Sequence, residues 1–382
     1  MQVTGTAARR QRNPAFRSFL TCKSQGAPNT APALAWPAMS LRPPAFSVII
    51  PTHNRCALVE RAIGSVLAGA SANDVEMIVV DDASTDGTQK VLGEKYRSDT
   101  RVTLLRSELN EGPSGARNRG LAAATGDFVV FLDSDDVLLP DTLALAQAAF
   151  EQVPQMQYLT FEGDATSIER HTLKRRIVRD VNPGWRAEGF DARRLQRRAI
   201  KLSDGVEAPP HTVEFGDFFP AVVFGDLFWL SGLVIRRRAA LDAGPFDTRY
   251  RNLEDWDFTA RLCMTGLGGY LDYVGFHRET GRTDQLSNAG NLWLRAVMHH
   301  HILANVRATG RMQSEASQRV LRRAQAAADY CLGHRLLERH HDHFGRAYLT
   351  RSLRHAYKPV KSLVWLIGGQ QLARVPRHLG GT

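Results

Sequence analysis

One stretch constrains the fold of this chain more than any other, because an apolar run leads directly into three aspartates. Residues 128–132 are five apolar side chains in succession, which is typical of a strand buried on both faces. The chain continues as Asp133-Ser134-Asp135-Asp136, here called the acidic segment. Carboxylates are rarely buried unless they are paired or bind a metal. We therefore expect the strand to end at the surface of the core, with the carboxylates just outside it.

The three carboxylates of the acidic segment permit two interpretations. Like charges repel at neutral pH, and a divalent cation would offset the repulsion, since Mg²⁺ is typically held by one or two carboxylates together with substrate phosphates. Ligands of open parallel α/β sheets bind at the carboxyl ends of the strands. The alternative is an acidic turn that caps the next helix, which the pattern predicts at residues 140–150.

Strand and helix patterns alternate over residues 46–150, which predicts an α/β fold with a mostly parallel sheet flanked by helices. The other strands predicted in this half are residues 46–50, 75–80 and 102–105. The first two of these strands are followed by polar side chains: Asn54, Arg55, Asp81 and Asp82. Parallel strands bring such residues to one edge of the sheet, beside the acidic segment, so we expect a nucleotide site there.

The second half of the chain carries a strongly basic stretch and an acidic helix start. Residues 171–201 contain ten Lys and Arg side chains. They indicate either a solvated surface insertion, over about residues 165–205, or a patch that binds an anionic acceptor or lipid headgroup. A helix is predicted from residue 252, with Glu254 and Asp255 in its first turn. The helix dipole favours charged carboxylates there by about 0.3–1 kcal/mol, so charge compensation alone would also explain both acids.

The two ends of the chain differ in character. Residues 1–43 show neither apolar periodicity nor the apolar core of a secretory signal, which predicts a disordered tail in which Met39 is a candidate functional start. Residues 289–382 are predicted to form a helical C-terminal region, whose segment 359–372 either rests on a membrane surface or packs as a core helix. Adjacent histidines in this region would point to different sides of a helix, which disfavours a metal site.

The net charge and the cysteines indicate which partners and which cellular compartment to expect for this protein. The net charge is +10, with 49 Lys and Arg against 39 Asp and Glu, which suits a nucleotide, an acidic polymer or an anionic membrane face. No zinc-finger spacing or RNA-binding aromatic signature occurs, so we expect no nucleic-acid partner. Four widely spaced cysteines are typical of free thiols in a reducing cytoplasm, and no apolar run is long enough to span a membrane.

Short motifs that stand in order over residues 46–287 resemble family 2 glycosyltransferases, the inverting enzymes of the GT-A fold. They read Phe-Ser-Val-Ile-Ile-Pro-Thr-His-Asn-Arg at 46–55, Val-Val-Asp-Asp-Ala-Ser-Thr-Asp-Gly-Thr at 79–88, Ala-Arg-Asn at 116–118, Phe-Leu-Asp-Ser-Asp-Asp at 131–136, Gly-Pro-Phe-Asp at 244–247 and Glu-Asp-Trp-Asp at 254–257. Each motif alone is a weak signal, whereas the ordered set is highly specific. The resemblance implies a glycosyltransferase domain at residues 44–288.

The resemblance also implies a role for each matching residue. Asp82 would accept a hydrogen bond from the imide of a uracil-type base. The residues that would border the nucleotide-sugar are Pro51, Thr52, Asn54, Arg55, Asp81, Asp82, Arg117, Asn118, Asp133, Ser134 and Glu254. Asp255 matches the catalytic base of the family.

For the metal, Asp133-Ser134-Asp135 resembles the DXD motif of the family. Asp135 would reach Mn²⁺ or Mg²⁺ on the diphosphate, and Asp133 and Asp136 would contact the metal, its waters, the ribose or the sugar. This chain departs from the family at Thr280, where members often carry a histidine that joins the metal. His277 would then be the substitute ligand, if there is a third one.

Together these features predict a metal-dependent inverting glycosyltransferase that transfers a sugar, most simply from a UDP-sugar, to a hydroxyl of a glycan or lipid-linked acceptor. Polysaccharide assembly at the cell envelope, in the cytoplasm or at the inner membrane face, is the setting that the resemblance implies. The alternative is a degenerate domain that binds the nucleotide-sugar without turnover. A dehydrogenase is disfavoured because no Gly-x-Gly-x-x-Gly turn follows Ile50 or Val80, and a nucleotidyltransferase because no basic Gly-rich loop follows the first strand.

Overall fold

A computed structural model describes residues 44–69, 74–167, 169, 171–186, 190–201, 211–250, 253–282, 292–310, 313–355 and 357–372. The predicted tail with Met39, and the predicted boundary between residues 288 and 289, lie outside these ranges. All of the described residues fall within one compact unit, residues 42–382.

A mixed sheet forms the centre of the structure, with the strand order β3-β2-β1-β4-β10-β6-β11-β9-β8. Its parallel half consists of β1 (Phe46–Thr52), β2 (Val75–Asp82), β3 (Val102–Ser107) and β4 (Phe128–Phe131). The remaining strands are β5 (Asp136–Leu138), β6 (Met156–Ser167), β7 (Thr172–Lys174), β8 (Gln196–Ile200), β9 (His211–Gly216), β10 (Leu233–Arg236) and β11 (Leu267–Thr280). Because β10 is antiparallel to both β4 and β6, the direction of the strands changes beside the acidic segment.

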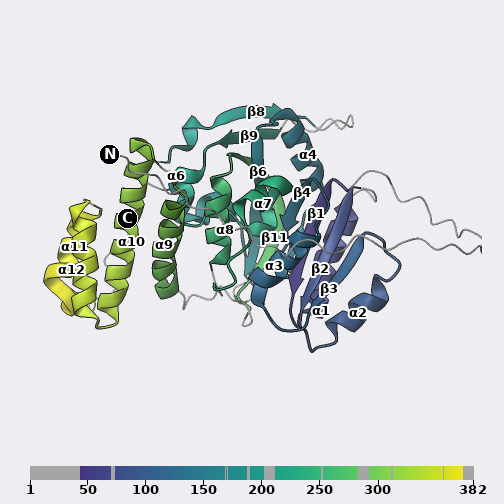
Figure 1. Ribbon diagram of the computed structural model, residues 1–382, viewed down its shortest axis with the longest axis horizontal. Helices are drawn as coiled ribbons and strands as arrows, with labels where there is room; N and C mark the ends of the chain where they lie inside the picture. The colour runs from purple at the N-terminus through teal and green to yellow at the C-terminus, as the bar shows by residue number, and fades with distance from the viewer. Residues whose placement is uncertain are drawn as a thin grey trace, which may run out of the picture. The chain divides into compact units, whose positions relative to one another are not determined.

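Helices cover both faces of this sheet (Figure 1). The α-helices are α1 (Cys56–Gly69), α2 (Thr88–Lys95), α3 (Gly112–Ala123), α4 (Thr142–Gln152), α5 (Ile177–Val181), α6 (Phe219–Val222), α7 (Arg237–Ala243), α8 (Glu254–Cys263), α9 (Leu292–Ala308), α10 (Glu315–Glu338), α11 (Asp342–Arg354) and α12 (Pro359–Leu372). Three short 3₁₀ turns are η1 (Pro183–Arg186), η2 (Ala192–Arg194) and η3 (Leu230–Gly232). The mostly parallel α/β fold that the sequence predicts is confirmed.

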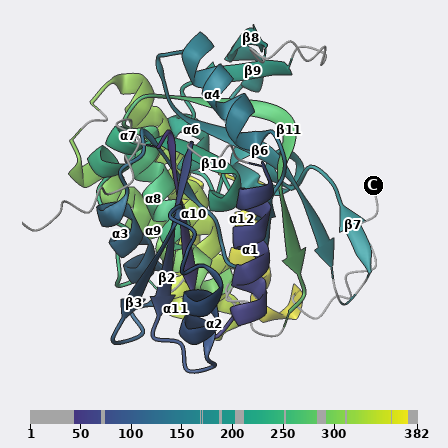
Figure 2. The same ribbon diagram turned by 90° about the vertical axis from the view of Figure 1, so that its right-hand side faces the viewer.

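The alternation of side chains along β1 explains why both faces are covered. Ile49 belongs to the apolar cluster that also contains Ala116 of α3 and Phe258 of α8. Val48 belongs to the second cluster, which contains Val59 of α1. Successive residues of a strand point to opposite faces, so an uninterrupted apolar run needs a helix layer on each side, and Figure 2 shows α1 and α3 on opposite sides of β2.

The interpretation of the acidic segment as a helix cap is wrong. After the acidic segment the chain enters β5, which pairs with β11 in the register Asp136 to Arg278. Helix α4 begins only at Thr142, and its N-cap is Asp141. Buried Leu138 explains the difference, because an apolar side chain two residues after Asp136 favours the return of the chain to the sheet.

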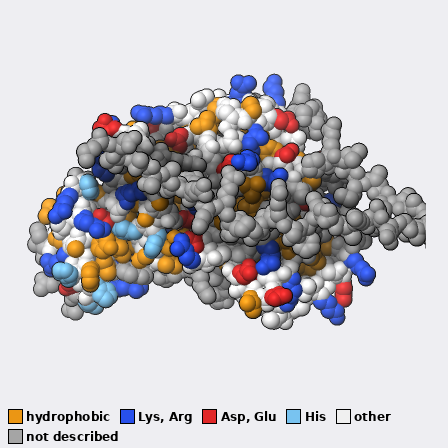
Figure 3. Space-filling view, in the orientation of Figure 1, with side chains coloured by type: hydrophobic (Ala, Val, Ile, Leu, Met, Phe, Trp, Pro, Cys, Tyr) orange, Lys and Arg blue, Asp and Glu red, His pale blue; other side chains and the backbone are white. Residues whose placement is uncertain are grey.

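The described part of the basic stretch extends the sheet, because β7 pairs with β6 and β8 pairs with β9. Ile177, Val178 and Trp185 are buried in the core. Arg179 pairs with Glu214 of β9 at 3.1 Å. Other arginines stay exposed, and Figure 3 shows Lys and Arg side chains at the top of the view, where β8 and β9 lie in Figure 1.

The C-terminal helices α9–α12 confirm the predicted helical character of their segments, and α9 lies against α8. The ring of His299 packs against that of Trp256 at an angle of 48°, with 4.9 Å between the ring centroids, and its Nε2–H donates to the carbonyl oxygen of Val223 at 2.7 Å. Burial lowers the pKa of His299 to about 4, so the imidazole is neutral at pH 7. No helix in the described ranges combines the length and apolar character that crossing a bilayer requires.

We expect Gly163→Ala to destabilise the protein, because a Cβ at Gly163 would lie 2.3 Å from Cζ of Phe276, a ring with no exposed surface. Overpacking of this kind costs about 1–3 kcal/mol. Gly64→Ala on the exposed side of α1 is the matched control: its Cβ meets nothing within 4 Å, and the change should stabilise the helix by about 0.5–1 kcal/mol. Urea unfolding of both variants measures this, and shifts of the same sign would contradict the packing described above.

Candidate active site

Three distant segments meet at the buried guanidinium of Arg117 in α3. Its Nη2 donates to Oδ1 of Asp133 in the acidic segment at 2.7 Å, and its Nη1 donates to Oε1 of Glu254 at the start of α8 at 2.8 Å. The ring of Phe246 lies under the guanidinium, 5.4 Å from its carbon to the ring centroid. Burial opposes the charge, but the two carboxylates outweigh it and raise the pKa of Arg117. The acidic segment and the first turn of α8 are therefore held together.

Asp255 follows directly in the first turn of α8. Its side chain is half-buried, and Oδ1 accepts from the backbone N–H of Trp256 at 2.8 Å. Burial, together with the neighbouring charge of Glu254, raises the pKa of Asp255 to about 7, against the opposing charge of Arg117. A carboxyl group with such a pKa can exchange a proton near neutral pH.

The carboxylates of the acidic segment face three different partners. Asp133 faces Arg117, and the Asp135 carboxylate lies 3.5 Å from Nη1 of Arg55. Asp136 turns inward and accepts from the hydroxyl of Ser231 at 2.6 Å. Burial raises the pKa of Asp136 to about 7. Ser134 is also buried.

No group of three or more His, Cys, Asp or Glu side chains within the described ranges is arranged to hold a metal ion. The acidic segment is thus not a preformed three-carboxylate cage. His277, the candidate substitute ligand, has its Nε2 at 3.1 Å from the hydroxyl of Thr166.

At the ends of β1 and β2, hydrogen bonds fix the side chains that are predicted to bind the nucleotide. Both oxygens of Asp82 accept from backbone N–H groups at the start of α3, from Glu111 at 3.0 Å and from Gly112 at 2.8 Å. Asp81 accepts from the N–H of Ser84 at 2.9 Å and pairs with Arg106 at 2.7 Å.

The segment after β1 is fixed onto the segment after β2. Asn54 has a left-handed backbone, with φ of 52°, and its side-chain oxygen accepts from the N–H of Thr85 at 2.7 Å. Pro51 and Thr52 are buried at the end of β1. These contacts give the sheet edge a fixed shape at the place where the sequence predicts the nucleotide.

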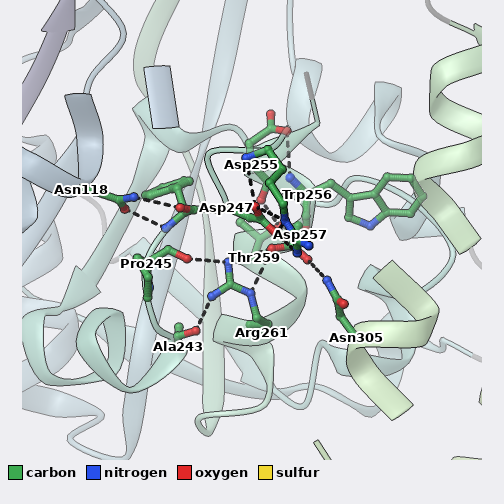
Figure 4. A network of polar contacts seen from close by, with 12 residues as sticks. Asn118, Ala243, Pro245, Asp247, Asp255, Trp256, Asp257, Thr259, Arg261 and Asn305 are labelled. Atoms are coloured by element: carbon green, nitrogen blue, oxygen red, sulfur yellow. Dashed lines mark hydrogen bonds and ion pairs between the residues drawn. The ribbon is translucent and has the colours of Figure 1, made fainter. Parts of the chain in front are cut away.

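Asn118 lies apart from the acidic segment. Its amide exchanges two hydrogen bonds with the backbone of Phe246, at 2.8 and 2.7 Å, so it fastens the 244–247 loop to α3. In Figure 4 the carboxylate of Asp255 points away from the network around Asp257. Asp257 pairs with Arg261 at 2.8 Å and accepts from Asn305 of α9 at 3.0 Å.

Sequence reasoning missed Ser231 and the network around Asp257. Ser231 joins two members of the acidic segment, because its Oγ also accepts from the N–H of Asp133 at 3.2 Å. No motif marks this serine, which lies 95 residues after Asp136. The spacing of Asp257 and Arg261 on one helix was a usable signal, since residues four apart share a helix face.

Residues 47–208 match the model of glycosyl transferase family 2. A GalNAc(5)-diNAcBac-PP-undecaprenol β-1,3-glucosyltransferase of Campylobacter jejuni is 44% identical over 110 residues, which is 28% of this chain and 35% of that protein. The chain spans 35% and 40% of the length of the first two curated relatives that it matches.

Two solved structures share the fold. S. aureus TarS 1-349 in complex with UDP-GlcNAc has a TM-score of 0.51 at 19% identity, over 87% of this chain and 93% of that one. Mannosyltransferase PcManGT from Pyrobaculum calidifontis, in complex with GDP-Man and Mn²⁺, has a TM-score of 0.50 at 18% identity, over 88% and 82%. The family match, the relatives and the fold agree with the motifs: residues 47–208 match a glycosyltransferase family 2 domain, and the described structure has the GT-A fold.

Proposed function

We propose that this protein is an inverting glycosyltransferase that moves a sugar from a nucleoside-diphosphate donor to a hydroxyl of a glycan or lipid-linked acceptor. One observation carries the proposal: Arg117 ties the acidic segment to the helix turn that bears Asp255. A carboxyl group with a pKa of about 7 therefore lies close to the candidate diphosphate site. Transfer to a hydroxyl needs these two groups together, one for the leaving diphosphate and one for the attacking oxygen.

The donor side of the proposal rests on the fixed sheet edge around Asp82 and Asn54. A rigid site for the nucleotide lowers the entropic cost of binding. The solved neighbours contain UDP-GlcNAc and GDP-Man, which supports a sugar nucleotide as the donor class. We favour a UDP-sugar, because the Asp82 position is the one that the family uses for a uracil-type base.

The residues of the acidic segment fit a divalent metal in the mode that Mg²⁺ and Mn²⁺ use with nucleotides. One or two carboxylates suffice when substrate phosphates complete the coordination. Asp135 is the first candidate ligand, and Asp133 keeps one oxygen away from Arg117, with 37% of its side chain exposed. When bound, such an ion would stabilise the negative charge that develops on the departing diphosphate.

The acceptor side rests on Asp255 as the general base. An acceptor hydroxyl is a weak nucleophile until its proton is removed, and a positioned carboxylate can take that proton as the oxygen attacks the anomeric carbon. Attack from the face opposite the leaving diphosphate inverts the anomeric centre in a single displacement. Glu254 stays bound to Arg117 and holds the turn in place.

The nature of the acceptor follows from the relatives and from the charge of the protein. The Campylobacter relative is named for an undecaprenol-linked substrate. A net charge of +10 favours anionic acceptors and anionic membrane surfaces. We therefore propose a glycan or lipid-linked acceptor at the inner membrane face.

The second candidate function is a domain that binds the nucleotide-sugar without turnover. No observation favours it, because the acids that catalysis needs are present at Asp135 and Asp255. Release of free nucleotide on addition of an acceptor separates the two candidates.

Asp255→Asn should abolish transfer, with a loss of about 10²–10⁴-fold in kcat, and should leave the affinity for the nucleotide-sugar unchanged. Asp257→Asn, on the same helix but facing Arg261, is the matched control and should keep most of its turnover per folded molecule. Because the ionised form of Asp255 is the active one, kcat should fall as the pH drops through about 7. Wild-type turnover in Asp255→Asn, or a rate independent of pH from 5 to 8, would refute the assignment.

Asp135→Ala should remove both Mn²⁺ binding and activity, measured by calorimetry in the presence of UDP and by a turnover assay with added Mn²⁺. Asp99→Ala, whose carboxylate only pairs with Arg101 at 2.8 Å, should change neither. Full activity of Asp135→Ala in the presence of a chelator would show that the metal assignment is wrong.

A further inference from the structure

A polar cavity lies among the C-terminal helices, and none of its residues belongs to the candidate active site. Helix α10 packs against both α9 and α11 (Figure 1), and the cavity beside it has a volume of about 380 Å³. Ligand cavities in proteins measure about 300–1,000 Å³, so this one has room for a small molecule. The residues that line it are Arg307, Gln325, Asp329, Arg351, Arg354 and His355.

One buried carboxylate fixes two of the three arginines that line the cavity. Asp329, with 3% of its side chain exposed, accepts from Nη2 of Arg351 at 2.7 Å and from the amide of Gln325 at 3.1 Å. His300 also contacts this carboxylate, with 2.9 Å between Nε2 and Oδ1. The side-chain oxygen of Gln325 accepts in turn from Nη1 of Arg307 at 2.7 Å. The guanidinium groups of Arg307 and Arg351 are therefore held in place before any ligand binds.

The charge of this cavity is not balanced by the residues that line it. Three guanidinium groups face the single carboxylate of Asp329, which leaves two positive charges in excess before any charge on His355 is counted. Arg354 has no ion-pair or hydrogen-bond partner for its side chain among the described residues. Arg307 donates only to the uncharged side chain of Gln325. Like charges at one site repel each other, and an anion bound between them offsets the repulsion.

The size of the charge excess indicates which class of anion the cavity fits. Guanidinium groups bind carboxylates and phosphates through paired N–H donors. A carboxylate carries one negative charge, whereas a phosphate monoester carries about −1.5 to −2 at pH 7, which matches the excess. A metal cation would be repelled by the arginines, and an apolar molecule would leave the polar lining without hydrogen-bond partners.

We propose that the cavity among α9, α10 and α11 binds a phosphate monoester or diphosphate group through Arg307, Arg351 and Arg354. The inference does not depend on the proposed transfer reaction, because these arginines lie outside residues 47–208, which match the family model. It gives the helical C-terminal region a binding role of its own. The group can come from two sources, a free phosphate compound or a lipid whose headgroup ends in a phosphate.

The first test measures pyrophosphate binding by calorimetry on the full chain, with a chelator present so that no metal joins the probe to the acidic segment. Arg354→Gln and Arg307→Gln each remove one charge from the cavity and leave the pair of Arg351 with Asp329 intact. Each variant should bind pyrophosphate about tenfold more weakly, as expected for the loss of a hydrogen bond to a charged group. Arg354→Lys keeps the charge and should keep most of the affinity.

Arg238→Gln on α7 is the matched control for the loss of one positive charge. Its side chain is 84% exposed, pairs with Asp242 at 3.1 Å and does not line the cavity. This variant should bind pyrophosphate as tightly as the wild type. Equal weakening in Arg238→Gln and in the two cavity variants would overturn the proposal, because the effect would then come from the overall charge of the protein.

The second test identifies the source of the phosphate by sedimentation of the protein with vesicles. The vesicles consist of phosphatidylcholine with or without phosphatidic acid, whose headgroup is a phosphate monoester. A loss of about tenfold in binding to the phosphatidic acid vesicles in Arg354→Gln and Arg307→Gln would assign a lipid. Unchanged vesicle binding together with weakened pyrophosphate binding would assign a free phosphate compound. If the two variants change neither pyrophosphate binding nor vesicle binding, the proposal is wrong.

Discussion

The structure of the active-site region depends on one buried charge. The guanidinium of Arg117 has only 6% of its side chain exposed and lies between the carboxylates of Asp133 and Glu254. A buried cation is tolerated only when it is paired, and removal of a partner from such a pair commonly costs about 3–5 kcal/mol. The three segments that carry these residues are therefore held in one arrangement, although they are separated by up to 137 residues in the sequence.

The position of Arg117 is itself set by Asp82 at the end of β2. The two oxygens of Asp82 bind the N–H groups of Glu111 and Gly112, where α3 begins. Gly112 has a φ of 76°, a left-handed conformation that glycine adopts without a steric penalty. A carboxylate at the N-terminus of a helix is also favoured by the helix dipole. A continuous path of fixed contacts thus runs from the candidate nucleotide edge, along α3, to the turn that carries Asp255.

The sequence alone was sufficient for the parallel half of the fold, because apolar strands followed by polar turns are local patterns. It was not sufficient for β5, which pairs with residues of β11 about 140 positions away. This long-range pairing makes the segment a strand, where the local pattern also allowed a helix cap. The hydrogen-bond partners of Asp133, Asp136 and Asn118 could not be predicted either. These partners are Arg117, Ser231 and the backbone of Phe246, and only tertiary packing brings them close. The packing of the described part of the basic stretch involves the pairing of Arg179 with Glu214 and the burial of Trp185, which no local pattern indicates.

The most direct test of this account is a double-mutant cycle at the two carboxylates that share Arg117, with the free energy of unfolding measured by urea titration. Each of Asp133→Ala and Glu254→Ala leaves the guanidinium with one partner, whereas the double variant leaves it buried with none. We predict that the double variant loses about 1 kcal/mol or more beyond the sum of the two single losses. Additivity within about 0.5 kcal/mol would contradict the claim that one buried charge holds these segments together.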